Sequence, residues 1–69
     1  EGSTQPHGWQ VHLLAYYKCG AGKLDEGIRL YKRALALKPR HPDALYNLGV
    51  AFTEKGEFDK AVFMWVAAA

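Results

Sequence analysis

The sequence predicts an all-α fold in which four antiparallel helices form two helical hairpins. In residues 43–54, apolar side chains recur every three or four positions, which places them along one stripe of a helix. Residues 55–57 interrupt this pattern, and Gly56 suits the left-handed conformation that ends many helices. The apolar spacing resumes at Phe58. A helix, a short turn and a second helix are therefore expected over the C-terminal part of the chain.

The N-terminal part is expected to begin with a lead-in and a first helix. Residues 1–8 are polar, with one proline and two glycines, and are interpreted as a flexible lead-in and not as a targeting peptide. The first helix is expected over residues 9–18, with Val11, Leu14 and Ala15 facing inward.

The second helix is expected over residues 24–37. Its apolar stripe carries large side chains at Leu24, Ile28, Tyr31 and Leu35. Gly27 and Ala34 are small enough to let neighbouring helices approach. Cations occupy the opposite face, at Arg29, Lys32 and Arg33. Pro39 and Pro42 separate this helix from the third, because Pro42 fits a first-turn position.

The third and fourth helices are expected to pack closely together. Gly49 lies within the apolar stripe of the third helix, where glycine costs about 1 kcal/mol of helix propensity relative to alanine. A glycine kept there indicates a close neighbour, for which Ala61 is the expected partner. The predicted core draws on all four helices: Val11, Leu14, Leu24, Ile28, Tyr31, Leu35, Leu45, Leu48, Phe52, Phe58, Ala61 and Trp65.

This pattern resembles the tetratricopeptide repeat. The residues that match the large, small and aromatic signature positions of that family are Leu45, Leu48, Gly49, Phe52, Gly56, Phe58, Ala61 and Trp65. The family repeats every 34 residues, and at this offset Gly22, Asp25, Ala34 and Leu14 recur as Gly56, Asp59, Ala68 and Leu48. The resemblance implies an α-solenoid fragment with one repeat at 9–41, whose first helix is degenerate, and a truncated repeat at 42–69.

The register of the first helix stays open. Tyr17 occupies the position at which the family places a small residue, and Lys18 the position of an aromatic one. Sliding the helix by one residue would bring Tyr17 into the aromatic position, but would displace the other inward residues from theirs.

The composition argues against several functional classes. The chain has 69 residues, a formal net charge of +2 and one cysteine, so we expect one small domain without an internal disulfide. The only conceivable catalytic set is Cys19, His12 and Asp25, and the histidine spacings match no zinc pattern. We therefore expect no enzyme activity within these residues, no metal and no cofactor. No apolar run is long enough to cross a bilayer, and no targeting signal indicates a compartment.

The resemblance implies a protein–protein interaction module. In this family the first helices of the repeats line a concave groove that binds a peptide or a partner's helix. The matching groove residues are Trp9, His12, Tyr16, Tyr46, Asn47, Val50 and Glu54. Asn47 matches an asparagine that many members use to hold a ligand backbone, since an amide both donates and accepts hydrogen bonds. His12 and Tyr16 stand where carboxylate-clamping members place lysine and asparagine, so a carboxylate clamp is not expected.

Three functional readings follow. The first is a scaffold or adaptor, or a small subunit of a larger assembly. The alternative is a regulatory or substrate-selecting arm of a larger enzyme, such as a glycosyltransferase or phosphatase. An RNA-binding helical repeat is less favoured, because its cations would lie on the outward-facing second helix, at Arg29, Lys32, Arg33, Lys38 and Arg40.

The fourth helix carries a second candidate surface. Thirty-four residues after the three cations of the second helix, the equivalent outward positions hold Phe63, Val66 and Ala67. This helix is thus apolar nearly all round, which is typical of a helix buried on both sides. Phe63 and Val66 are predicted to contact another chain or a later part of this one. Ala69 falls within a helical pattern without a cap, so the chain is interpreted as part of something longer.

Overall fold

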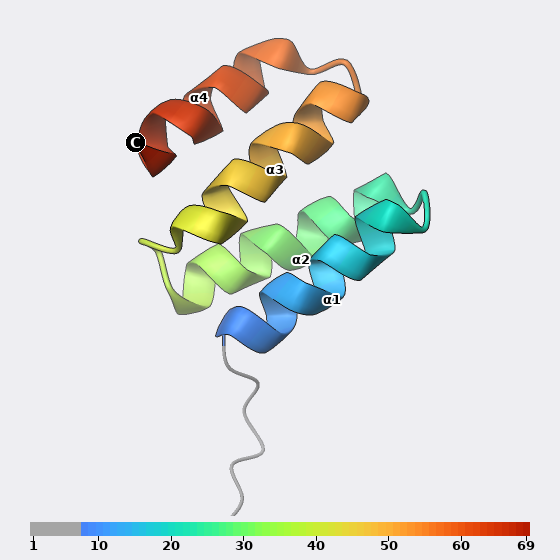
Figure 1. The fold of residues 1–69 in the computed structure, drawn as a ribbon, viewed down its shortest axis with the longest axis vertical. Helices are drawn as coiled ribbons and strands as arrows, with labels where there is room; N and C mark the ends of the chain where they lie inside the picture. The colour runs from blue at the N-terminus through green and yellow to red at the C-terminus, as the bar shows by residue number, and fades with distance from the viewer. Residues whose placement is uncertain (1–7) are drawn as a thin grey trace, which may run out of the picture.

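The computed structural model describes residues 8–69, with side chains from Gln10 onward. It contains four helices: α1 (Gly8–Gly20), α2 (Leu24–Leu37), α3 (Pro42–Glu54) and α4 (Phe58–Ala68) (Figure 1). No strand occurs in this part of the chain, so the predicted all-α fold is confirmed. The helix α2 has the expected bounds, and α1 and α3 are slightly longer than expected. Residues 1–7 of the expected lead-in lie outside the described residues.

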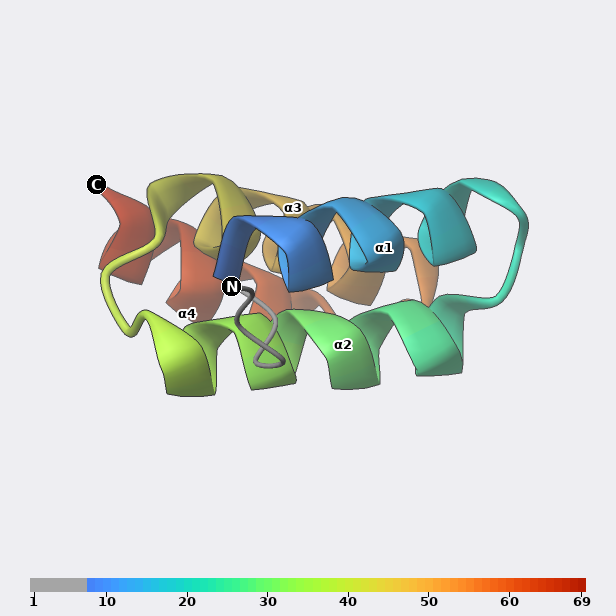
Figure 2. The ribbon, with the colours of Figure 1, turned by 90° about the horizontal axis from the view of Figure 1, so that it is seen from below.

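The helices form two antiparallel hairpins that stack through α2 and α3. The pairs α1–α2 and α3–α4 pack along their lengths, and α3 also contacts both α1 and α2. Seen from below, α1 and α3 lie on one side of the stack, with α2 on the other (Figure 2). α3 is therefore the helix that contacts every other helix, and α1 and α3 together present one continuous face.

Both hairpin turns close in the same way. Gly22 and Gly56 have φ values of 85° and 83°, the left-handed region that glycine adopts without strain. The backbone N–H of Lys23 donates to the Lys18 carbonyl at 2.9 Å, and that of Glu57 donates to the Phe52 carbonyl at 2.8 Å. These bonds satisfy carbonyls that the preceding helix leaves open, as in a Schellman motif. The predicted role of Gly56 is confirmed.

Half of the predicted core is buried, and the rest is not. The buried members are Val11, Ile28, Tyr31, Leu48, Phe52 and Ala61. Leu24, Leu35 and Leu45 are half-buried, and Leu35 packs against the core. Leu14, Phe58 and Trp65 are exposed, so the prediction was wrong for these three. Four alanines share the core instead: Ala15, Ala34, Ala44 and Ala51. Small side chains are buried because the helices approach one another closely at these positions.

Leu14 and Leu48 show why equivalent residues differ in burial. They are 34 residues apart, yet Leu14 is 47% exposed and Leu48 is 1% exposed. Leu48 lies on α3, which packs against α4 on one side and against the first hairpin on the other. Leu14 lies on α1, and no described helix packs in front of α1 as the first hairpin packs in front of α3.

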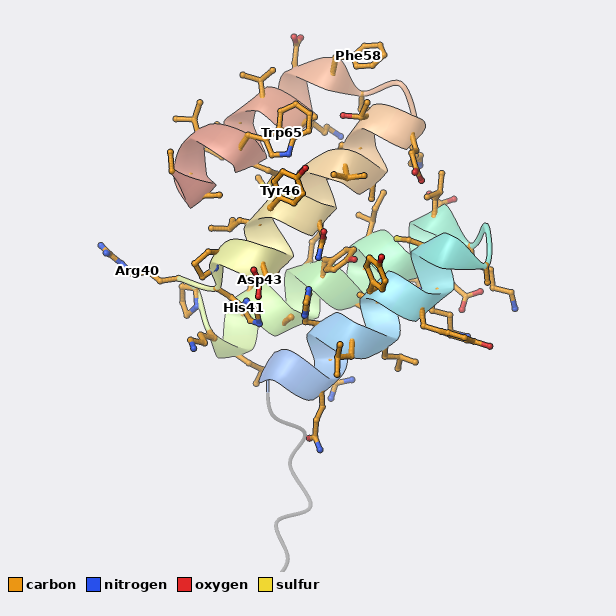
Figure 3. All side chains as sticks on the ribbon, in the orientation of Figure 1. Arg40, His41, Asp43, Tyr46, Phe58 and Trp65 are labelled. Atoms are coloured by element: carbon orange, nitrogen blue, oxygen red, sulfur yellow. The ribbon has the colours of Figure 1, made fainter. Side chains whose placement is uncertain are left out.

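The nearest neighbour of Gly49 is Trp65, whereas Ala61 was the expected one. A Cβ atom built on Gly49 would lie 2.3 Å from Trp65 Nε1, so only glycine leaves room for the indole ring. The indole N–H donates to the Tyr46 carbonyl at 3.2 Å, and the rings of Tyr46 and Trp65 lie 6.4 Å apart (Figure 3). Trp65 thus packs across α3 while remaining 37% exposed. Ala61 and Trp65 share one face of α4, and the indole is the longer side chain.

The first helix keeps its unshifted register. Val11 and Ala15 are buried, whereas Tyr17 is exposed. Lys18 forms an ion pair with Glu26 of α2, with 3.4 Å between Lys18 Nζ and the carboxylate. Lys18, which stands where the family has an aromatic residue, therefore lies at the edge of the contact between α1 and α2.

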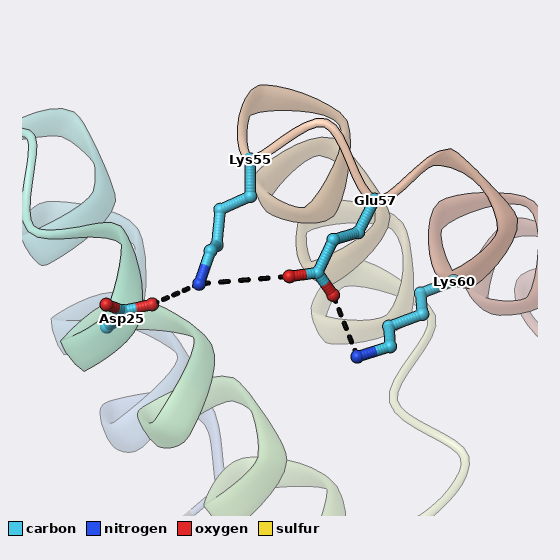
Figure 4. A network of polar contacts seen from close by, with 4 residues as sticks. All are labelled: Asp25, Lys55, Glu57 and Lys60. Atoms are coloured by element: carbon cyan, nitrogen blue, oxygen red, sulfur yellow. Dashed lines mark hydrogen bonds and ion pairs between the residues drawn. The ribbon is translucent and has the colours of Figure 1, made fainter.

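A chain of ion pairs connects the two hairpins. Lys55 donates a hydrogen bond to Asp25 of α2 and lies 3.8 Å from the Glu57 carboxylate, which lies 2.8 Å from Lys60 Nζ (Figure 4). The bond from Lys55 lowers the pKa of Asp25, and the bond from Lys60 lowers the pKa of Glu57. Because Asp25 and Lys60 are exposed and Lys55 and Glu57 are partly exposed, solvent screens the attraction, and the network contributes little to stability.

Candidate functional site

The predicted groove lies on the face that α1 and α3 share. Asn47 of α3 meets His12 of α1, with 2.9 Å between the amide nitrogen and His12 Nε2. The amide N–H donates here when the imidazole carries its proton on Nδ1. Among the described residues, no other hydrogen bond occupies the Asn47 side-chain carbonyl oxygen or its second N–H.

His12 also packs against two further rings. Its centroid lies 4.9 Å from that of His41 and 5.7 Å from that of Tyr31. His41 is buried and caps α3, because its Nδ1 accepts the backbone N–H of Ala44 at 3.3 Å. Three helices therefore meet around His12, next to the groove.

Acidification is expected to weaken the fold through His12. Burial lowers the pKa of His12 below 6.5, and the neighbouring His41 lowers it further, while Asp43 opposes the shift. A depressed histidine pKa means that the unfolded chain binds protons more readily. Stability is therefore full above pH 6.5 and falls as the pH drops from there towards the folded-state pKa.

His12→Gln is expected to reduce this acid-dependent loss. The measurement is the urea midpoint of unfolding, followed by circular dichroism from about pH 7.5 to about pH 5. Glutamine retains an amide that can pair with Asn47 but does not titrate. An unchanged pH dependence in the variant would show that His12 is not responsible.

A pocket of about 270 Å³ lies between α1 and α3, over the side chain of Tyr31 from α2. It is lined by Tyr16, Cys19, Gly20, Tyr31, Asn47, Val50, Ala51 and Glu54. Four residues of the predicted groove thus come together in it: Tyr16, Asn47, Val50 and Glu54. His12 adjoins the pocket through Asn47, and Tyr46 lies apart from it, against Trp65. The side chain of Trp9 lies outside the described part of the structure.

Four residues that line the pocket were not among the predicted site residues: Cys19, Gly20, Tyr31 and Ala51. Cys19 follows His12 by seven positions on α1, a spacing that puts both on one face and could have indicated it. Tyr31 was assigned to the core, and nothing in its spacing on α2 indicates that it also forms the floor of a pocket.

The pocket favours the neutral forms of the Tyr31 phenol and the Cys19 thiol. Burial raises the pKa of the Tyr31 phenol, and Cys19, Tyr16 and Glu54 add to the effect. Burial and Glu54 likewise raise the pKa of the Cys19 thiol. A raised pKa opposes formation of the nucleophilic thiolate. Asp25, the third member of the conceivable catalytic set, is paired with Lys55 instead.

The second candidate surface lies on α4. Phe63 is 68% exposed and Val66 is 70% exposed, with Val62 also exposed beside them. Met64 turns inward and packs against the core. Within residues 8–69, no group of histidine, cysteine or acidic side chains is arranged to hold a metal ion. None of the four described helices has the length and hydrophobicity required to span a membrane.

Comparison with known families identifies the fold. The sequence profile described as "Tetratricopeptide repeat" matches residues 12–69. The chain belongs to the tetratricopeptide repeat family. Tetratricopeptide repeats are non-catalytic folds that bind other proteins, so protein–protein interaction is the functional class of this chain.

The chain is also similar to short stretches of much longer plant proteins. Each is described as a probable UDP-N-acetylglucosamine–peptide N-acetylglucosaminyltransferase SPINDLY. The protein from Eustoma exaltatum subsp. russellianum is 46% identical over 41 residues, 59% of this chain and 4% of that protein. The Arabidopsis thaliana protein is 44% identical over 41 residues, with the same shares. The Oryza sativa subsp. japonica protein is 41% identical over 49 residues, 71% of this chain and 5% of that protein.

Proposed function

We propose that this tetratricopeptide chain is a scaffold or adaptor module, or a small subunit of a larger assembly. It is proposed to comprise one repeat at residues 9–41 and a second at residues 42–69. Two surfaces bind partners: the groove on α1 and α3, and the outer face of α4.

The exposed outer face of α4 carries this proposal. Phe63 and Val66 are each more than two-thirds exposed, and leaving such side chains in water forgoes roughly 1.5–3 kcal/mol each relative to full burial. Contiguous exposed apolar side chains typically mark an interaction surface. The equivalent positions of α2 hold Arg29 and Lys32. Of these two helices, therefore, only α4 has an apolar outer face.

Replacing Phe63 with glutamate and Val66 with lysine is expected to reduce partner association at least tenfold while leaving the helix content unchanged. A tenfold change in affinity corresponds to about 1.4 kcal/mol. This is less than the burial free energy that the two apolar side chains together would lose. The measurements are co-purification of partners with the natural full-length protein and far-ultraviolet circular dichroism.

The matched control is Arg29→Glu, which places the same glutamate–lysine pair at the equivalent positions of α2. It should leave association unchanged. Equal co-purification by the double variant and the unsubstituted protein would exclude the α4 face as a binding surface.

The groove supplies the second surface. It presents exposed aromatic rings at Tyr16 and Tyr46, a half-buried Val50 and the free amide groups of Asn47. His12 and Trp9 extend the proposed surface along α1. This combination suits an apolar or aromatic peptide segment whose backbone pairs with the amide.

A second function is supported by the similarity to the plant proteins. In this alternative, the chain is a substrate-selecting or regulatory arm of a larger glycosyltransferase-like enzyme. The chain spans about 4–5% of the length of the curated relatives that it matches. Extending their activity to the protein that contains this chain is therefore a proposal. The mass of the native polypeptide separates the two. A polypeptide of 69 residues excludes the enzyme arm, whereas one that includes a catalytic domain supports it.

A further inference from the structure

The pocket between α1 and α3 is small enough for a side chain of a partner to fill much of it. Its volume of about 270 Å³ lies below the roughly 300–1,000 Å³ of pockets that hold drug-sized ligands. Its walls are mainly apolar: Tyr16 on α1 faces Val50 and Ala51 on α3. The Tyr16 ring is exposed and so is available for stacking.

Two hydrogen-bond acceptors in this pocket have no partner among the described residues. The Glu54 carboxylate forms no ion pair there, unlike Asp25, Glu26 and Glu57. Tyr31 is 1% exposed, and its hydroxyl makes no hydrogen bond within the described part of the chain. Tyr31 is one of the residues that line the pocket. A phenolic hydroxyl can accept a hydrogen bond from a ligand.

The charged side chain of the pocket is acidic. Glu54 is the only charged residue among those that line the pocket, and Asp43, at the start of α3 and electrostatically coupled to His12, is also acidic. The whole chain carries a formal net charge of +2, so its cations lie elsewhere, including Arg29, Lys32 and Arg33 on α2. The groove therefore attracts a cationic group, against the overall charge of the chain.

We propose that this pocket binds an arginine side chain from an extended segment of the partner protein, with the guanidinium on Glu54. This inference rests on the proposed binding function of the groove. The aliphatic stem would lie between Tyr16 and Val50, and the Tyr31 hydroxyl would accept one guanidinium N–H. Arginine fits better than lysine because its planar head pairs with a carboxylate through two bonds and stacks on an aromatic ring.

The test uses pools of nine-residue peptides in which the central residue is fixed and the others are randomised. The fixed residue is arginine, lysine, leucine or glutamate, and binding to the natural full-length protein is measured by fluorescence anisotropy. The arginine pool should bind about tenfold more tightly than the leucine pool, and more tightly than the lysine pool. Glu54→Gln should remove most of this preference, and Tyr31→Phe a smaller part of it.

The matched control is Asp59→Asn, which removes one exposed carboxylate at the start of α4, outside the pocket. It should leave the arginine preference unchanged. Equal binding of all four pools would overturn the arginine inference and leave the binding function of the groove intact. If Glu54→Gln and Asp59→Asn weakened the arginine preference equally, that preference would depend only on net charge. This result would also overturn the inference. The absence of binding by every pool would overturn the inference together with the proposed groove function.

Discussion

Replacing Leu48 with alanine will lower the free energy of unfolding by about 2–5 kcal/mol, the range for a leucine truncated in a packed core. Leu48 is 1% exposed, on the helix that contacts all three others. A cavity there loosens both the α3–α4 hairpin and the stacking of the two hairpins. Urea unfolding followed by circular dichroism measures the loss.

Leu14→Ala is the matched control, because it makes the same change 34 residues earlier. Leu14 is 47% exposed, so its truncation leaves a smaller void and should cost about 1 kcal/mol or less. Equal losses at the two positions would mean that α1 is covered as fully as α3 in solution, contrary to the described packing.

Replacing Gly27 with alanine is expected to destabilise the fold by about 1–3 kcal/mol, the usual cost of overpacking. A Cβ atom there would lie 2.2 Å from Cys19 Sγ and 3.0 Å from the Ala15 carbonyl oxygen. The helix propensity gained, about 1 kcal/mol, offsets only part of this cost. Because one of the clashing atoms belongs to the backbone, α1 and α2 must move apart.

Two further variants test the cause of this destabilisation. Gly20→Ala introduces the same methyl group into open space and should be close to neutral. Adding Cys19→Ala to Gly27→Ala removes the nearer of the two contacts, so the double variant should lose less stability than the separate losses sum to. Additive losses, measured by thermal or urea unfolding, would contradict the contact between Gly27 and Cys19.

Local features of this chain were predictable from its sequence because they depend on neighbouring residues. Leu24 and Leu37 bound α2 as expected, since the apolar spacing and the following proline act within a few residues. Gly56 adopts its positive φ for the same reason, because the left-handed conformation is favoured by glycine whatever lies beyond the turn. Membership of the tetratricopeptide repeat family also followed, because its signature is a fixed order of large and small residues.

The candidate site was predictable only in part. Spacings of three, four and seven residues put Asn47, Val50 and Glu54 on one face of α3, and Tyr16 on the corresponding face of α1. The contact between Asn47 and His12 depends on how far α1 is displaced along α3, a distance that helical periodicity does not contain. The place of Tyr31 beneath the pocket depends on α2 passing under both helices.

The sequence by itself determined where the helices and turns lie, and which face of each helix is apolar. The tertiary structure alone decided which apolar residues are covered. Ala61 and Trp65 share one face of α4, and the offset between α4 and α3 makes the indole of Trp65 the group nearest to Gly49, although Ala61 was the expected neighbour. Leu14 and Leu48 match in the repeat, but only Leu48 has a hairpin packed in front of it. The burial of a residue depends on what packs against its helix, and the apolar pattern of one helix does not specify which element that is.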